Sequence, residues 1–154
     1  MTLFLAAVGR LRPFFREAVD EYLGRLRRYG AVEEREVREA GRAGNPVAQR
    51  REEGARLRDA VPAGARLVAL DLAGVAWSSE ALAARLEVWR GAGPDTAFLI
   101  GGAEGLDPTL LRQAAERWSL GPLTLPHELA RVVVAEQLYR AATILAGQPY
   151  HKGA

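Results

Sequence analysis

The chain of 154 residues is long enough for one domain with a sizeable core, and 49% of its residues are hydrophobic. It contains no cysteine, which excludes disulfides, thiol nucleophiles and cysteine-ligated metals. The formal net charge of +2 permits nucleic-acid binding without requiring it, and no apolar run has the roughly 18 residues of a transmembrane helix. Since the two histidines are far apart and no carboxylates show ligand spacing, we expect no metal site and a cytoplasmic protein without membrane contact.

The chain alternates apolar runs with segments of helical periodicity. In chain order, the first half predicts a strand at 3–8, a helix from Pro13 to Gly30, a weaker and more exposed strand at 31–38, a loop at 40–46 and a solvated helix at 47–60. The second half predicts a buried strand at 66–72 ended by Gly74, a helix capped by Ser78 or Ser79, a strand at 96–100, a helix at 110–117, an apolar segment at 120–125 and a long helix at 129–146. Strands that alternate with helices indicate an α/β fold with a mostly parallel sheet and helices on both faces.

The segment TAFLIGGAEGLDP, residues 96–108, leads from an apolar strand through three glycines to a helix start. It lacks the spacing of both a P-loop and a dinucleotide fingerprint, and Glu104 would repel a phosphate. Two interpretations stay open. The glycines either only turn the chain, or they let a ligand approach the backbone at the carboxyl ends of the strands. The segments 69–74 and 119–131 have the same uncharged character, so three strand ends would line a pocket suited to an adenine edge rather than a triphosphate.

Several motifs together resemble the RlmH family of SPOUT methyltransferases over essentially the whole chain. They are IGGAEGL, SLGPLTLPHELARVVVAEQLYRA, the terminal PYHK and the opening LAAVGRLR and EYLGRL. Ala103 departs from the family pattern, where Pro or Ser is expected. The resemblance implies a methyltransferase that uses S-adenosylmethionine to methylate N3 of a pseudouridine in a hairpin of 23S ribosomal RNA, in the large ribosomal subunit or the 70S ribosome.

The resemblance also implies a specific fold and assembly. The expected architecture is a SPOUT-type α/β fold, a single domain over 1–154 with a C-terminal trefoil knot at about 99–150, although knots are nearly absent from proteins. The helix at 129–146 is apolar around much of its circumference, which suits a homodimer interface, with an ordinary core helix as the alternative.

The resemblance assigns a set of cofactor-binding residues, whose contacts are expected to be largely through the backbone. They are Leu70, Gly102, Leu120, Gly121, Pro122, Leu123, Thr124 and Leu125. Valine at Gly102 is expected to block this pocket. His127 has two interpretations, a local hydrogen bond at a helix start or a contact in the pocket.

On the acceptor side, Tyr150 and His151 are expected to position or deprotonate the target base, because an aromatic ring stacks on bases and imidazole titrates near neutral pH. By sequence alone a frayed tail is the alternative. Arg131 and Arg140 suit phosphate recognition, with surface ion pairing to Glu136 as the alternative, and Arg140 completes the catalytic set that we predict.

Two rival functions also fit parts of the sequence. One is a non-catalytic nucleotide-binding or ribosome-associated α/β protein. The other is a Rossmann-like or flavodoxin-like domain for a phosphate-containing cofactor, which the absence of a phosphate fingerprint disfavours.

Overall fold

The computed structural model describes residues 1–91 and 93–151, the last of them by its backbone only. In chain order the elements are β1 (Leu3–Val8), α1 (Pro13–Leu26), the short 3-10 helix η1 (Arg27–Tyr29), β2 (Val32–Val37), α2 (Pro46–Ala60), β3 (Arg66–Ala76), α3 (Ser79–Gly91), β4 (Thr96–Ile100), α4 (Pro108–Gln113), β5 (Glu116–Ser119), α5 (His127–Leu145) and η2 (Pro149–His151).

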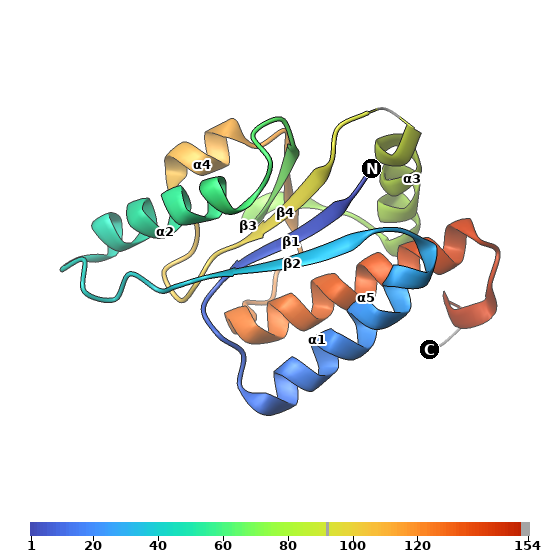
Figure 1. The fold of residues 1–154 in the computed structure, drawn as a ribbon, viewed down its shortest axis with the longest axis horizontal. Coiled ribbons are helices and arrows are strands. Elements are labelled where there is room, and N and C mark those ends of the chain that lie inside the picture. The colour runs from blue at the N-terminus through green and yellow to red at the C-terminus, as the bar shows by residue number, and fades with distance from the viewer. Residues whose placement is uncertain (92, 152–154) are drawn as a thin grey trace.

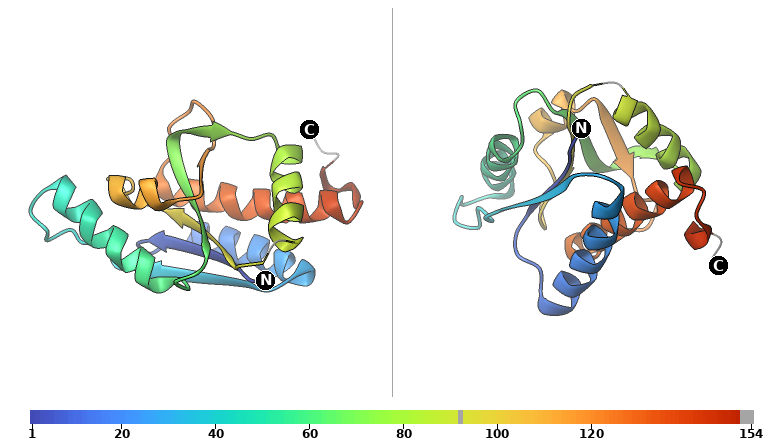
Figure 2. Two further views of the ribbon diagram at one scale, coloured as in Figure 1. Left: turned by 90° about the horizontal axis from the view of Figure 1, so that it is seen from above. Right: turned by 45° about the vertical axis from the view of Figure 1, so that its right-hand side comes forward.

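The five strands form one sheet in the order β2-β1-β4-β3-β5, and every neighbouring pair is parallel. All carboxyl ends therefore meet at one edge of the sheet. Helices α1, α3 and α5 cover one face, and α2 and α4 cover the other (Figures 1 and 2). The predicted α/β fold with a parallel sheet and helices on both faces is confirmed.

The core follows from strands that are apolar on both faces. Along β1, Leu3, Leu5 and Ala7 pack with residues of α1, α3 and α5, whereas Phe4 and Val8 pack with α2 and α4. A strand buried on both sides reads as a continuous apolar run, as β1 does. Each fully buried leucine contributes about 1.5–3 kcal/mol through the hydrophobic effect, so these two clusters supply most of the folding free energy.

The predicted helix at 110–117 is wrong in its second half. Helix α4 ends at Gln113, and Glu116–Ser119 forms the strand β5 beside β3. The backbone N–H of Ala115 already donates to the carbonyl of Leu67, at 2.9 Å. This pairing connects residues that are far apart in the sequence, so the local pattern of leucines and alanines could not reveal it.

Strand β3 continues through Gly74 to Ala76, beyond the predicted end. Its register with β5 shifts between Leu70 and Val75. A Cβ on Gly74 would lie 2.6 Å from the carbonyl oxygen of Arg117. Glycine is therefore present because β5 passes close to it, and it does not end the strand.

Two helices also differ in detail from the prediction. Helix α2 is not fully solvated, because Glu53, Gly54 and Leu57 are buried against the sheet. Helix α5 begins two residues earlier than expected, at His127. Within the described residues, no helix combines the length and the apolar character needed to cross a bilayer.

Candidate active site

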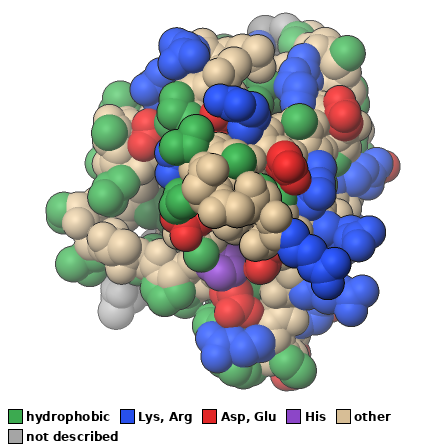
Figure 3. Space-filling model, turned by 90° about the vertical axis from the view of Figure 1, so that its left-hand side faces the viewer, with side chains coloured by type: hydrophobic (Ala, Val, Ile, Leu, Met, Phe, Trp, Pro, Cys, Tyr) green, Lys and Arg blue, Asp and Glu red, His purple; other side chains and the backbone are tan. Residues whose placement is uncertain are grey.

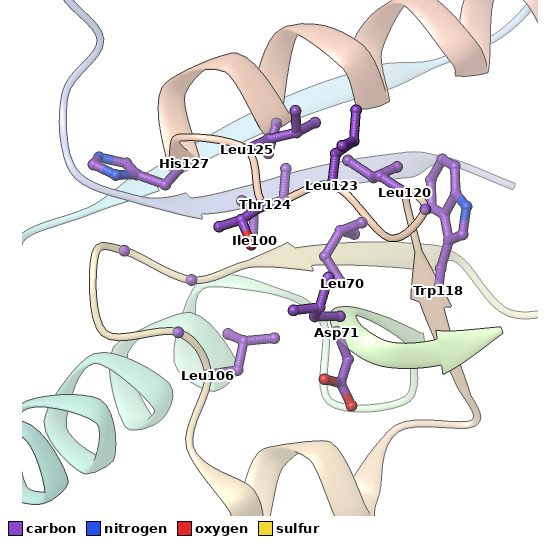
Figure 4. A pocket seen from close by; sticks show the side chains of 16 residues that line it. Leu70, Asp71, Ile100, Leu106, Trp118, Leu120, Leu123, Thr124, Leu125 and His127 are labelled. Carbon is purple, nitrogen blue, oxygen red and sulfur yellow. The ribbon is translucent and has the colours of Figure 1, made fainter. Parts of the chain in front are cut away.

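A cavity of about 180 Å³ opens at the carboxyl edge of the sheet, beside the ends of β4 and β5 and the part of β3 where its register with β5 shifts. Its lining comes from the strand ends, the glycine loop and the segment that leads into α5. The residues are Leu70, Asp71, Leu72, Ile100, Gly101, Gly102, Gly105, Leu106, Trp118, Leu120, Gly121, Leu123, Thr124, Leu125, His127 and Ala130. The three segments that the sequence paired therefore do meet at one cavity (Figure 4).

The glycine loop after β4 folds back on itself. The N–H of Gly105 donates to the carbonyl of Gly102 at 3.1 Å, and Gly105 has a φ of +77°, which favours glycine. A Cβ on Gly101 would lie 2.6 Å from the backbone carbonyl carbon of Gly105. The glycines therefore turn the chain, and the backbone of the loop also lines the cavity. That a ligand approaches this backbone stays a prediction.

Gly102 lines the cavity, but a side chain at this position would point elsewhere. Its Cβ would lie 3.1 Å from the Val8 side chain and 3.6 Å from Glu53 Oε1, on the side of α2. The expectation that valine at Gly102 blocks the pocket is therefore wrong. The substitution would press on the end of β1, and its effect on ligand binding would be indirect.

The segment after β5 turns sharply at Gly121, whose φ is +115°. The Ser119 hydroxyl both accepts from the Gly121 N–H and donates to the Gly121 carbonyl, each at 3.2 Å. The chain then passes along one side of the cavity, opposite Leu106 (Figure 4). Of the residues predicted to bind a cofactor, only the exposed Pro122 does not line the cavity. That the others contact a cofactor stays a prediction.

The cavity also contains residues that sequence reasoning did not select, notably Asp71, Ile100 and Trp118. Asp71 is the one carboxylate in the lining, and its Oδ1 accepts the N–H of Ala73 at 3.1 Å. Its signal in the sequence was a lone acid in an otherwise apolar strand. Among the residues that the structure describes, no Lys or Arg lines the cavity, so this lining suits a neutral or cationic ligand rather than a phosphate.

His127 begins α5 and lines the cavity. This favours the interpretation as a pocket contact over a local hydrogen bond at the helix start. Its neighbour Glu128 binds the loop after β1, accepting the backbone N–H of Arg12 at 2.7 Å and its Nε at 3.0 Å. The hydrogen bond from the Arg12 backbone is the main reason that the pKa of Glu128 lies below its ordinary value.

Arg131 is buried, with 1% of its surface exposed, so both interpretations of it, phosphate contact and surface ion pair, are wrong. Its Nη2 donates to the Gly9 carbonyl at 2.9 Å, and its Nη1 forms ion pairs with Glu36 and, at 3.5 Å, with Glu34. Arg16 pairs with the same two carboxylates. Glu136 is not a partner of Arg131 among these contacts. The sequence could not reveal this network because its members are up to 122 positions apart.

The predicted acceptor residues gather at the other end of α5. Tyr150 donates its hydroxyl to Glu136 Oε2 at 2.8 Å, Arg140 pairs with the same oxygen at 3.0 Å, and the Arg140 guanidinium lies 4.9 Å from the centre of the Tyr150 ring. Burial, and then the hydrogen bond to Glu136, raise the pKa of Tyr150 above its ordinary value, so the phenol stays protonated at neutral pH. The side chain of His151 and all of Lys152 lie outside the described residues.

Along α5, Arg140 lies well beyond His127, which begins the helix and lines the cavity. Thirteen residues of α5 separate His127 from Arg140, which at 1.5 Å per residue is about 20 Å. In Figure 1, α5 runs from the carboxyl edge of the sheet to the opposite end of the molecule, where η2 follows. The structure therefore brings together the predicted cofactor residues and, separately, Tyr150 and Arg140. Among the described residues, no three His, Asp or Glu side chains form a group that could hold a metal ion.

Comparison with known proteins identifies the family. A family model described as predicted SPOUT methyltransferase matches residues 1–151. The chain is 50% identical, over 99% of its length and 98% of the relative's, to a Ribosomal RNA large subunit methyltransferase H of Acidithiobacillus ferrooxidans. The chain belongs to the RlmH family of SPOUT methyltransferases. It is therefore an enzyme.

Two solved structures resemble this fold at low sequence identity. A tRNA (m1G37) methyltransferase of Aquifex aeolicus superposes with a TM-score of 0.55 at 15% identity, over 91% of this chain and 70% of that chain. A putative methyltransferase of Legionella pneumophila, solved with bound SAM, superposes with a TM-score of 0.50 at 14% identity, over 92% of this chain and 66% of that chain. Both likenesses support the SPOUT fold, and at this identity they support nothing finer.

Proposed function

We propose that this enzyme uses S-adenosylmethionine to methylate ribosomal RNA of the large subunit, at N3 of a pseudouridine in a 23S rRNA hairpin. The observation that carries the proposal is a cavity at the carboxyl edge of the sheet that is lined mainly by glycines and aliphatic side chains, with Asp71 as the one carboxylate among its described lining residues. It lies in a chain that is 50% identical over its whole length to a relative named as a large-subunit rRNA methyltransferase.

The residues present fit this cofactor. The described part of the lining contains no Lys or Arg, which disfavours NAD or ATP. A sulfonium and an amino group are cationic and suit a site that contains Asp71. The cavity of about 180 Å³ is smaller than a usual site for a ligand of this size, so it would enclose the adenine portion while the remainder lies toward the rim. We propose that Leu70, Gly102 and the segment at 120–125, Pro122 included, hold it, largely through backbone groups.

The cofactor supplies a methyl group already activated on a positively charged sulfur. The protein then has two tasks, to hold the acceptor nitrogen in line with that methyl group and to accept the proton from N3. We propose that Tyr150 and Arg140 position the base, because the Tyr150 phenol stays protonated and donates to Glu136. His151 is the proposed proton acceptor, since imidazole titrates near neutral pH.

We further propose a homodimer in which the acceptor residues of one protomer complete the cavity of its partner. Arg140 lies about 20 Å along α5 from His127 of the cavity lining, so the acceptor group is displaced along the helix from that end of the cavity. Leu72 and Leu123 line the cavity with 61% and 76% of their surface exposed, and Val75 is 62% exposed on the same strand as Leu72. Such exposed apolar side chains at a site favour burial by a partner.

A mixing experiment tests this arrangement. Gly101→Ala impairs the cavity and His151→Ala impairs the acceptor group, so each variant alone should be nearly inactive. Coexpressed, they should regain about a quarter of the wild-type activity, because half of the random dimers are mixed and each contains one intact composite site. Single-turnover methylation of rRNA measures this recovery, and no recovery above the separate variants would refute the shared site.

Mass spectrometry of large-subunit rRNA tests the proposed reaction itself. The rRNA of a strain that lacks the protein should lose one methylated pseudouridine and regain it after purified enzyme and cofactor are added. Calorimetry should detect S-adenosylmethionine and S-adenosylhomocysteine but neither NAD nor ATP. Binding of neither sulfur compound would favour a non-catalytic interaction protein, and binding of NAD would favour a Rossmann-like function.

Three further expectations belong to this proposal. A chain with so little surface for RNA recognition would need a structured substrate, so we propose that it acts in the cytoplasm on the large subunit or the 70S ribosome. Equal methylation of the isolated hairpin would contradict this. We also propose that residues 1–154 form one domain with a trefoil knot at about 99–150.

A further inference from the structure

A second cavity, of about 530 Å³, opens beside the ends of β1 and β2. It is lined by Gly9, Arg10, Glu36, Val37, Arg38 and Glu39. The end of β1 separates it from the cofactor cavity, because a Cβ on Gly102 would contact Val8, the residue before Gly9. Anything bound in this second groove therefore lies next to the proposed methyl-transfer site.

The charged groups of the groove differ in their pairing. Glu36 pairs with Arg16 and with the buried Arg131. With Glu34 and Asp20, they form a network of two arginines and three carboxylates. Arg10 and Arg38 also line the groove, and both are exposed without an ion-pair partner among the described residues.

The charged surface continues beyond the groove. Arg42 and Arg56 line an adjoining cavity together with Arg38 and Glu39. The Arg56 guanidinium donates to the Arg38 carbonyl at 2.7 Å and so supports that loop. Figure 3 views the molecule toward the carboxyl edge of the sheet and shows Arg side chains gathered along one side of this face.

The two arginines are presented by loops that are held in place. The loop after β1 is bound to α5, because Arg131 donates to the Gly9 carbonyl and Glu128 accepts the N–H of Arg12. Gly9 has a φ of +90°, and a Cβ there would lie 2.9 Å from Glu39 Oε1. Glycine thus lets the loops that carry Arg10 and Arg38 approach each other, and less entropy is lost when they bind a ligand.

We propose that Arg10 and Arg38 bind phosphates of the RNA backbone next to the target base. The guanidinium fork matches the geometry of phosphate oxygens, and a groove of this volume admits a nucleotide unit. Such contacts orient the RNA without reading its sequence. Because the groove would bind the phosphates, the cofactor cavity itself needs no cation. This inference rests on the proposed function, because it assumes that the acceptor is RNA.

The test compares two double variants that remove the same charge. Arg10→Gln/Arg38→Gln changes the groove, and Arg27→Gln/Arg28→Gln changes two exposed arginines in η1, which precedes β2 and so lies at the opposite edge of the sheet. Binding of a fluorescently labelled RNA hairpin and of large ribosomal subunits is measured by anisotropy and filter retention at several salt concentrations. Binding of S-adenosylmethionine is measured by calorimetry.

The groove variant should bind both RNA probes about tenfold or more weakly near 0.1 M salt, and its slope of log K against log salt should fall by about 1.5–2, which corresponds to two phosphates. Cofactor affinity should be unchanged, and Arg10→Lys/Arg38→Lys should retain most of the slope. The η1 variant should behave as wild type. Equal RNA binding by the two glutamine variants, or no RNA binding by the wild type, would overturn the proposal.

Two outcomes separate this inference from the proposed function. In the first, the wild type transfers no methyl group to rRNA while its binding of the hairpin still depends on Arg10 and Arg38. That result would refute the proposed methylation and support the proposed phosphate contacts. If methylation succeeds and the groove variant loses affinity for ribosomal subunits alone, a ribosomal protein occupies the groove and the phosphate assignment is wrong.

Discussion

Arg131→Ala is expected to lower the free energy of unfolding by about 3 kcal/mol or more, the size of effect found when one partner of a buried ion pair is removed. The substitution leaves Glu34 and Glu36 with Arg16 alone and deprives the Gly9 carbonyl of its donor. It also removes a fully buried side chain. Equilibrium unfolding in urea measures the loss.

The matched control is Arg25→Ala, which removes an arginine from a pair with Glu21 one turn away on α1. Water screens such an exposed pair, so this variant should unfold close to wild type. A second variant, Arg131→Met, keeps most of the buried volume. Its stability therefore separates the effect of losing the charge from the effect of losing buried packing. If Arg131→Ala were no less stable than Arg25→Ala, the buried network would have no structural role.

Gly101→Ala is expected to weaken cofactor binding about tenfold or more and to destabilise the fold by about 1–3 kcal/mol, as overpacking does when the neighbour cannot move. Its methyl group would lie 2.6 Å from the backbone of Gly105, and a backbone atom cannot rotate away as a flexible side chain can. The loop must therefore open, and the wall of the cavity moves with it. Calorimetry with S-adenosylhomocysteine and urea unfolding measure the two effects.

Gly64→Ala provides the same chemical change at a position where nothing lies within 4 Å of the new methyl group. It should bind the cofactor as wild type does and should unfold at a similar or slightly higher urea concentration, because alanine restricts the unfolded chain. Wild-type cofactor affinity in Gly101→Ala would show that the glycine loop is not a wall of the cofactor site.

Most of the fold and one part of the site could be predicted from local patterns. The strands at 3–8 and 96–100 matched, because a buried parallel strand is a short apolar run with glycine or proline beside it. The segments 69–74, 101–105 and 119–131 do meet at one cavity. Parallel strands bring their carboxyl ends to the same edge of the sheet. A prediction that the strands are parallel therefore also predicts that the segments following them lie close together.

Other parts of the site could not be predicted from local patterns. Strand β5 forms because it pairs with β3. A side chain at Gly102 would point toward Val8 and Glu53 because the glycine loop packs against the end of β1 and against α2. The burial of Arg131 depends on two carboxylates of β2. Each of these features depends on a contact between residues that lie far apart in the chain. The hydrophobic periodicity of a short segment cannot predict such a contact.

The sequence by itself determined the fold class, the family and the segments that surround the cofactor cavity, because hydrophobic periodicity, turn residues and motif spacing are all local properties. Only the tertiary structure decided that Arg131 is an internal cation, that Arg10 and Arg38 face an open groove, and that Tyr150 packs back on α5 at Glu136 and Arg140. The physical reason is that charge compensation and distance depend on which elements pack together. Those contacts arise only when the whole chain has folded.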